Sequence, residues 1–245
     1  IKIMAEFKLP TEVIDLPSKG LLYPKDSPLS EGKIEIKYMT AKEEDILSNS
    51  SYIKKGIVLD KLFKSLLVTK FNYDDLLIGD KNALMIAARV LGYGGNYEFE
   101  YNGEKQLVDL SKLEFVNIDE KLWANGNNFE YTLPSSKNKI TFKLLTHGDE
   151  MKISREVKSL QKINADSDST LTTRLKYMIT SVEGQTETKQ IREFVDNYLL
   201  ARDSRALREY IKEVQPDIDL TFFPPGSSNR RAIPIGLSLF WPDLG

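Results

Sequence analysis

The sequence predicts an α+β fold in which helices are combined with three antiparallel β-hairpins, and a helix-rich C-terminal half is closed by the last hairpin. Apolar residues recur at helical spacing through most of residues 151–214, and short alternating segments flanked by turn-forming residues lie on both sides of that region. The chain divides into an N-terminal α+β region with two hairpins (1–146) and a helical region with a C-terminal hairpin (147–245). The pattern is also compatible with one continuous fold.

The first third of the chain predicts a strand and two helices. Residues 33–39 alternate apolar and charged side chains, which is typical of a strand. Residues 40–43 (Thr-Ala-Lys-Glu) follow as a capping box and start a short helix that ends near Leu47. Apolar residues at helical spacing from 58 to 67 predict a second helix, which packs in the core.

Residues 79–97 predict one capped helix that runs directly into a hairpin. Asp80 is placed as the N-cap and Gly92 as the left-handed residue beyond the C-terminus. Arg89 projects from a face beside the apolar one. Its side chain is either exposed, as is usual for arginine, or an anchor for a buried carboxylate or a backbone carbonyl. Asp80 and Arg89 are therefore structural candidates.

Two hairpins are expected in the middle of the chain. Aromatic residues alternate with glutamates over residues 97–101, and Asn102 with Gly103 supplies a two-residue type I′ turn before residues 107–110 return. A second hairpin is predicted over residues 129–144.

Four helices are expected between residues 151 and 214. The second of them is predicted from Leu171 to Val182, and Asp203 with Ser204 is placed as the cap of the fourth. The short breaks between them favour antiparallel neighbours.

The chain ends in a third predicted hairpin, over residues 218–240, and a pair of large aromatic residues. Phe240 and Trp241 either fold back to seal the core or are offered to a partner, because tryptophan is enriched at binding hot spots. Both alternatives stay open at this point.

Composition excludes several classes of site. The 245 residues contain no cysteine and one histidine, so disulfides, thiolate zinc sites and cysteine nucleophiles are excluded. Lys and Arg number 34 against 36 Asp and Glu, and the net charge of −2 gives no overall field for nucleic acid or an anionic membrane. No apolar run approaches the ~20 residues of a membrane-spanning helix. We expect a protein made in the cytoplasm, without membrane contact.

No pattern for catalysis or nucleotide binding is found. The glycine-rich residues 92–95 follow a helix and precede a strand, which is the reverse of the order in a dinucleotide site. His147 is expected in a loop as polar surface, beside an N-cap at Asp149, and Asp74 with Asp75 is expected to decorate a helix start. We therefore expect a protein that is not an enzyme, with no catalytic residue, cofactor, metal or small-molecule substrate.

Arginines on the predicted C-terminal helices leave one alternative open. Residues 151–215 contain 12 Lys and Arg against 10 Asp and Glu, far fewer than a stripe that neutralises phosphates would need. A solvated helix surface with ion pairs is favoured. The alternative is a nucleic-acid-binding accessory protein that uses Arg202, Arg205 and Arg208.

Four short motifs occur in order along the chain. They are residues 16–20 (Leu-Pro-Ser-Lys-Gly) with Tyr23-Pro24, residues 39–44 (Met-Thr-Ala-Lys-Glu-Glu), Gly79-Asp80 with Arg89 and Tyr93-Gly94, and the terminal Phe240-Trp241-Pro242. Together they resemble the T4-type bacteriophage baseplate protein family, the hub subunits and hub-assembly factors of contractile tails. The resemblance runs over almost the whole chain and is weakest from about residue 113 to 169.

The resemblance implies a structural or assembly role in which the protein helps to form the baseplate hub through contacts with other phage tail and baseplate proteins. The implied location is the virion tail baseplate, or the host cytoplasm during assembly. The residues to which we assign interface or structural roles are Phe240, Trp241, Asp80, Arg89 and Tyr93.

The sequence departs from this family in its turns. Many members carry paired cysteines in the hairpin after the Tyr-Gly segment and in the last hairpin, where a zinc ion would clamp the turn. Here those turns contain Asn102-Gly103 and residues 224–226 (Pro-Pro-Gly), so no zinc site is carried over. A turn that is tight by itself would replace the metal clamp.

Overall fold

The structure is a computed structural model that describes residues 9–163 and 168–241. Within these residues, helices are combined with small antiparallel sheets of two or three strands. The predicted α+β class, with its helix-rich C-terminal half, is confirmed.

The N-terminal part contains a strand pair that the sequence did not predict in full. Strand β2 (Lys33–Lys37) was expected, and it pairs antiparallel with β1 (Thr11–Asp15). Helix α1 (Ala41–Leu47) begins at the predicted capping box and is followed by α2 (Ser50–Lys54) and α3 (Val58–Leu66), the predicted core helix.

Helix α4 (Ile78–Tyr93) begins and ends two residues away from the predicted caps. Its N-cap is Leu77 and its C-cap is Gly94, with φ of 84°. The prediction that Asp80 caps this helix is wrong, because Asp80 lies in the first turn and its carboxylate faces the segment of residues 16–24. Gly92 is helical, not left-handed, and it leaves room for the side chain of Met39.

The two central hairpins are confirmed. Strands β3 (Asn96–Tyr101) and β4 (Glu104–Asp109) are joined by Asn102 and Gly103, whose φ values of 52° and 81° are those of a type I′ turn. Strands β5 (Phe129–Thr132) and β6 (Lys139–Phe142) form the second hairpin.

The C-terminal half contains the expected helices with two corrections. Helix α6 ends at Met178, not Val182, because residues 179–182 form β7, which pairs with β6. Asp203 and Ser204 are not the N-cap of α8, which is Leu200; the Asp203 carboxylate instead accepts hydrogen bonds from the backbone N–H groups of Ser135 and Ser136. The bounds are α5 (His147–Ile163), α6 (Thr170–Met178), β7 (Ile179–Val182), α7 (Thr188–Asn197) and α8 (Ala201–Val214).

The third hairpin is present but short. It consists of β8 (Thr221–Phe222) and β9 (Arg231–Ala232), and a 3₁₀ turn, η5 (Leu237–Phe240), follows it. The predicted break over residues 164–169 lies partly outside the described residues.

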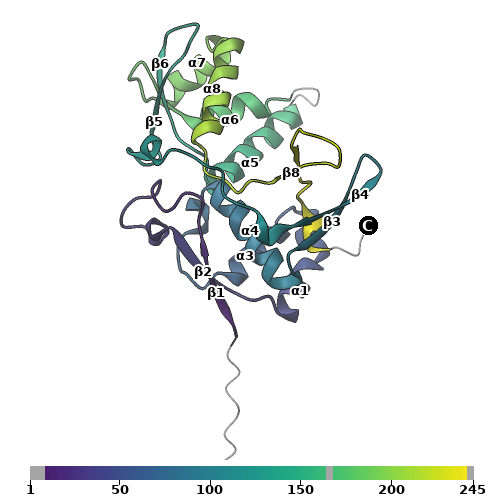
Figure 1. Cartoon of the computed structure of the whole chain (residues 1–245). Coiled ribbons are helices and arrows are strands. Elements are labelled where there is room, and N and C mark those ends of the chain that lie inside the picture. Colours follow the sequence, from purple (N-terminus) through teal and green to yellow (C-terminus); the bar gives the residue numbers. More distant parts are fainter. Residues whose placement is uncertain (1–8, 164–167, 242–245) are drawn as a thin grey trace, which may run out of the picture.

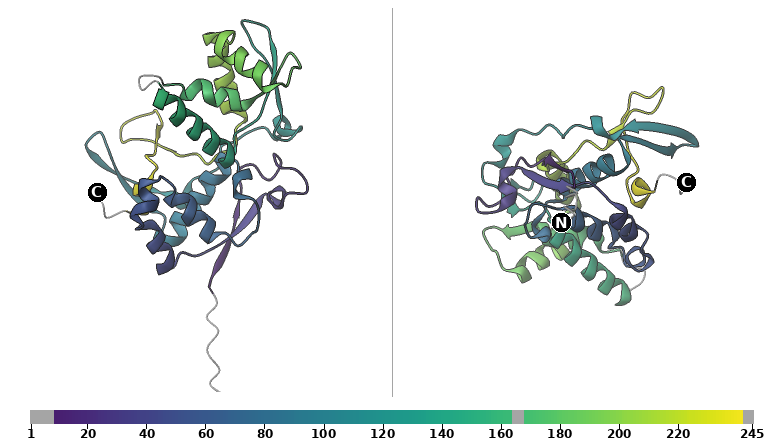
Figure 2. Two further views of the ribbon diagram at one scale, coloured as in Figure 1. Left: turned by 180° about the vertical axis from the view of Figure 1, so that it is seen from behind. Right: turned by 90° about the horizontal axis from the view of Figure 1, so that it is seen from below.

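Helices α5 to α8 and the β5–β6 hairpin lie at one end of the molecule, and α1, α3, α4, β1 and β2 lie at the other (Figure 1). The β3–β4 hairpin projects from the side, next to residues 233–241, which we call the last segment, and both views of Figure 2 show the same projection. The sheet of β5, β6 and β7 joins residues from both predicted regions. A division at residues 146 and 147 stays a prediction.

Asp80 is the centre of a buried polar network. Its carboxylate accepts hydrogen bonds from the Ser18 backbone N–H (2.9 Å), the Ser18 hydroxyl (2.7 Å) and the Tyr23 hydroxyl (2.6 Å). The Tyr23 oxygen in turn accepts from the backbone N–H of Leu77 (2.9 Å). Burial raises the pKa of Asp80, and the donors from Tyr23 and Ser18 oppose that rise. The network therefore fixes the segment of residues 16–24 against the first turn of α4.

Replacing Asp80 with alanine should lower the free energy of unfolding by about 3 kcal/mol, because the donors of Ser18 and Tyr23 would stay buried without an acceptor. Urea unfolding followed by circular dichroism measures the change. Asp26→Ala, at an exposed position, is the matched control and should shift stability by less than about 0.5 kcal/mol. Equal effects of the two variants would contradict the role given to Asp80.

Glu43 should make stability depend on pH in the acid range. Its side chain is fully buried; burial alone would raise its pKa, but hydrogen bonds from Lys37 Nζ (2.7 Å) and from Thr40 Oγ1 (2.6 Å) and N (2.9 Å) lower the pKa from 4.5 to about 2. Because the carboxylate is favoured in the folded state, this stabilisation is present above the unfolded pKa and is lost as the pH falls towards 2.

We expect wild-type protein to exceed Glu43→Gln in stability by about 2 kcal/mol at pH 6, a figure that allows for partial screening, and the gap to narrow steadily towards pH 3. Chemical unfolding at a series of pH values measures both proteins, with Glu44→Gln, on the exposed side of the same turn, as control. A gap that is independent of pH would show that Glu43 is not ionised in the folded protein.

Candidate protein-interaction surface

Four of the five predicted site residues lie around the β3–β4 hairpin and the end of the chain. Arg89 contacts the start of β3, Tyr93 lies beside Arg89, and Trp241 lines a groove next to the same strand. Phe240 is the neighbour of Trp241 in the chain but points into the core. Asp80 belongs to the opposite end of α4 and to the network described above.

Arg89 is an anchor for backbone carbonyls, which was one of its two predicted alternatives. The side chain is 2% exposed, and its Nη1 and Nη2 donate hydrogen bonds to the carbonyl oxygens of Gly94 (2.5 Å) and Asn96 (2.9 Å). The guanidinium lies 5.7 Å from the centre of the Tyr93 ring, a distance that allows a cation–π interaction. Burial lowers the pKa of Arg89, and nearby Tyr97 and Tyr93 oppose the shift. Arg89 thus fixes the turn between α4 and β3.

The two terminal aromatic residues have different roles. Phe240 is 1% exposed, and its ring centre lies 6.1 Å from that of Phe63 in α3, so it seals the core. Trp241 is partly buried and lines the groove. Phe240 therefore follows the first of the two predicted alternatives, and the contact of Trp241 with a partner stays a prediction.

The groove beside β3 has a volume of about 700 Å³ and mainly apolar walls. Leu47 and Ile53, from the end of α1 and from α2, form one wall, and residues 97–100 of β3 form another. Leu237 and Trp241, from the last segment, complete it. Exposed apolar walls of this kind are typical of sites that bind another protein.

Tyr97 fixes the position of the last segment against β3. Its hydroxyl donates to the carbonyl oxygen of Pro234 (2.9 Å) and lies 3.4 Å from the Ser238 hydroxyl. On the same strand, Phe99 makes an edge-to-face contact with Phe222 of β8, with ring centres 5.0 Å apart. The β3–β4 hairpin, Phe222 and the last segment thus form one packed unit.

His147 is not the exposed loop residue that the sequence predicted. It is the first residue of α5 and 4% exposed, with Nδ1 3.1 Å from Lys81 Nζ and Nε2 3.7 Å from Asp60 Oδ2. Burial lowers the pKa of His147, and the charge of Lys81 lowers it further. Asp149 is not the N-cap either: the hydroxyl of Thr146 accepts a hydrogen bond from its backbone N–H (3.3 Å).

The surroundings of His147 are those of an ion-pair network, not of a catalytic triad. Lys81 Nζ lies 2.6 Å from Asp60 Oδ1, which also accepts from the Tyr73 hydroxyl (3.1 Å). Within the described residues, no serine or threonine hydroxyl is hydrogen-bonded to the imidazole. The network joins α3, α4 and α5, and sequence reasoning missed it because its members are far apart in the chain.

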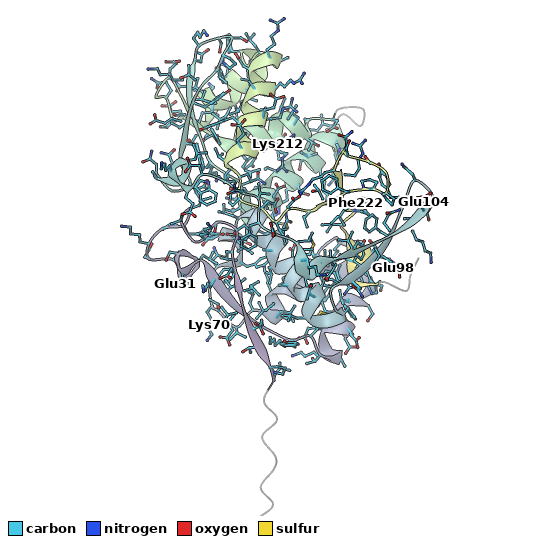
Figure 3. The ribbon with its side chains drawn as sticks, viewed as in Figure 1. Glu31, Lys70, Glu98, Glu104, Lys212 and Phe222 are labelled. Atoms are coloured by element: carbon cyan, nitrogen blue, oxygen red, sulfur yellow. The ribbon has the colours of Figure 1, made fainter. Side chains whose placement is uncertain are left out.

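Two of the three arginines named in the nucleic-acid alternative, Arg205 and Arg208, line a second groove of about 520 Å³ between α6 and α8, and Arg202 does not. Two of its cations are paired with carboxylates: Arg174 with Glu150 (2.7 Å) and Arg205 with Glu209 (3.1 Å). Arg208 and Lys212 also lie on this groove, and Figure 3 labels Lys212 there. The surface is therefore mixed in charge.

Two further features bear on function. In residues 9–163 and 168–241, no three carboxylate or imidazole side chains are grouped to hold a metal ion. Over the same residues, no helix has the length and apolar character needed to cross a membrane.

In comparisons with known proteins, no family model, curated protein or solved structure matches this chain.

Arg89→Ala should lower the free energy of unfolding by about 3 kcal/mol, because the carbonyls of Gly94 and Asn96 lose charged donors in a buried place. Arg89→Lys keeps a charge but has no fork with which to bridge two carbonyls, so we expect an intermediate loss. Thermal and urea unfolding measure both, with exposed Arg202→Ala as control. If the free energy of unfolding of Arg89→Ala equals that of the control variant, the anchoring role is contradicted.

Proposed function

We propose that this protein is a non-enzymatic structural or assembly protein of a contractile phage tail, which contributes to baseplate hub formation through protein–protein contacts. The apolar groove beside β3 is the observation that carries the binding role, because it offers exposed apolar walls on a fixed framework. The assignment to a phage tail rests on the four sequence motifs that resemble the T4-type baseplate proteins.

The positions of the motif residues support this proposal. Ser18 and Tyr23 from the first motif bind Asp80 from the third. Arg89 from the third motif holds the start of β3, and Trp241 from the fourth lines the groove. These residues of the first, third and fourth motifs therefore contribute to one framework that presents the groove.

The nucleic-acid alternative has less support. The α6–α8 groove does gather cations, but two of them are engaged by Glu150 and Glu209, and the helical region as a whole carries a small charge excess. Binding that depends on phosphate contacts needs cations that are free to replace counterions. Among the described residues, this surface fits a solvated helix surface with ion pairs better than a nucleic-acid-binding site.

Tagged full-length protein should capture other tail components from a lysate of cells infected with the phage that encodes it. Leu237→Ser, in the groove, should reduce the captured amount about tenfold, because a polar hydroxyl replaces apolar surface that a bound partner would bury. Leu200→Ser, at an exposed position in the loop before α8, is the matched control and should capture as wild type does. Mass spectrometry of the captured proteins is the measurement.

Capture of no tail component by wild-type protein would count against the proposal. A salt-dependent shift of DNA that disappears when Arg202, Arg205 and Arg208 are replaced would favour the nucleic-acid alternative instead. Mass spectrometry of purified virions then separates a retained baseplate component from an assembly factor that leaves.

A further inference from the structure

We propose that the free edge of β3 binds an extended segment of a partner protein by strand addition, and that this segment alternates apolar residues with lysine or arginine. The inference rests on the proposed function, since it assigns a binding mode and a partner chemistry to the same groove. Strand addition to an exposed sheet edge is a general mode of peptide recognition, in which backbone hydrogen bonds give affinity and alternate side chains give specificity.

The register of the hairpin shows which backbone groups are free. In a hairpin closed by a two-residue type I′ turn, the residues that flank the turn form a hydrogen-bonded pair, and the pairs then alternate along the ladder. Tyr101 pairs with Glu104 next to the turn. Glu100 and Glu98 therefore occupy the non-hydrogen-bonded pairs, and their N–H and C=O groups point away from β4.

These groups have no partner within the described residues. The sheet of β3 contains β4 alone, and no hydrogen bond involves the backbone N–H or C=O of Glu98 or Glu100. The carbonyl of Asn96 points to the same side, and there Arg89 Nη2 already donates to it. Arg89 thus closes one end of the edge and leaves a short open stretch that begins at Glu98.

The groove runs beside this open stretch. Residues 97–100 line it, with Leu47 and Ile53 across from the strand and Leu237 and Trp241 at the last segment. An added strand projects every second side chain to one face. Apolar residues of the partner on the groove side would contact Leu237 and Trp241, while its backbone pairs with β3.

The charges that line the groove indicate which residues should alternate with the apolar ones in the partner segment. Glu98 and Glu100 are the charged residues among the described residues that line the groove, and no described cation is ion-paired with either. Figure 3 labels Glu98 along the hairpin and Glu104 near its tip, at the edge of the molecule. Opposite charges directly across a strand pair are stabilising and like charges are destabilising. Lysine or arginine is therefore favoured opposite each glutamate.

The same charges argue against a second copy of this chain as the occupant. Two β3 edges in register would place the glutamates of one copy near those of the other, which is a common way for sheet edges to avoid self-association. The partner is therefore a different protein that supplies an extended basic and apolar segment.

The probe is a fluorescent, end-blocked peptide with the sequence Lys-Val-Lys-Phe-Lys-Val, titrated with full-length protein and followed by fluorescence anisotropy. Two control peptides keep the apolar residues. One has glutamate in place of each lysine, and the other carries a methyl group on the backbone nitrogen of each lysine, which removes the N–H groups that would pair with the C=O groups of Glu98 and Glu100 in an antiparallel ladder. Wild-type protein should bind the lysine peptide at least tenfold more tightly than either control.

Proline at position 100 tests the edge itself. Because the Glu100 N–H points away from β4, Glu100→Pro removes the free donor without removing a bond of the hairpin. We expect Glu100→Pro to weaken binding of the lysine peptide at least tenfold, and Glu100→Gln, which keeps the N–H and loses the charge, to weaken it about threefold. An unfolding midpoint close to that of wild type shows that the variant is folded.

Three results would overturn the inference. They are equal binding of the lysine and N-methylated peptides, unchanged binding in Glu100→Pro, and concentration-dependent self-association of wild type that Glu100→Pro abolishes without any peptide binding. The last would identify a second copy as the occupant. Capture of tail components that depends on Leu237 but not on the Glu100 N–H would leave the proposed function standing and remove strand addition alone.

Discussion

The position of α4 depends on one buried carboxylate. Asp80 collects three hydrogen bonds from Ser18 and Tyr23, and Tyr23 passes the network on to the backbone at the start of the helix. A buried acid without donors would be costly, so the segment of residues 16–24 and the helix must fold together. The C-terminal end of α4 leads directly into β3. The hydrogen bonds of Asp80 with Ser18 and Tyr23, which position α4, therefore also help to position the hairpin.

At the C-terminal end of α4, Arg89 fixes the start of β3, just as Asp80 fixes residues 16–24 at the N-terminal end. Both are charged side chains, fully or almost fully buried, whose partners are fixed by the fold. Between them, α4 carries β3, and the last segment packs against this strand through the Tyr97 side chain, away from the free edge. A strand that is already held by such contacts loses less conformational freedom when a partner binds, which favours the binding role that we propose for the groove.

Local signals predicted the parts of the fold that depend on neighbours in the chain. The capping box at residues 40–43 and the Asn102-Gly103 turn are examples, since each needs four residues or fewer. Asp80, Asp203 and Val182 were misplaced because distant partners decide their structure: a loop, a turn and a strand far from them in the sequence. The groove could not be predicted, because its walls come from three separate stretches that only tertiary packing brings together.

Gly79, in the first turn of α4, also depends on a segment that is distant in the sequence. A Cβ atom there would lie 1.7 Å from the carbonyl oxygen of Pro216, so the chain that returns from α8 rests directly on the first turn of α4. From that point the backbone goes on to β8, β9 and η5. A methyl group at this position would overlap that carbonyl group, so either the returning chain or the first turn of α4 would have to shift. The close approach of these two backbones therefore depends on a residue that has no side chain.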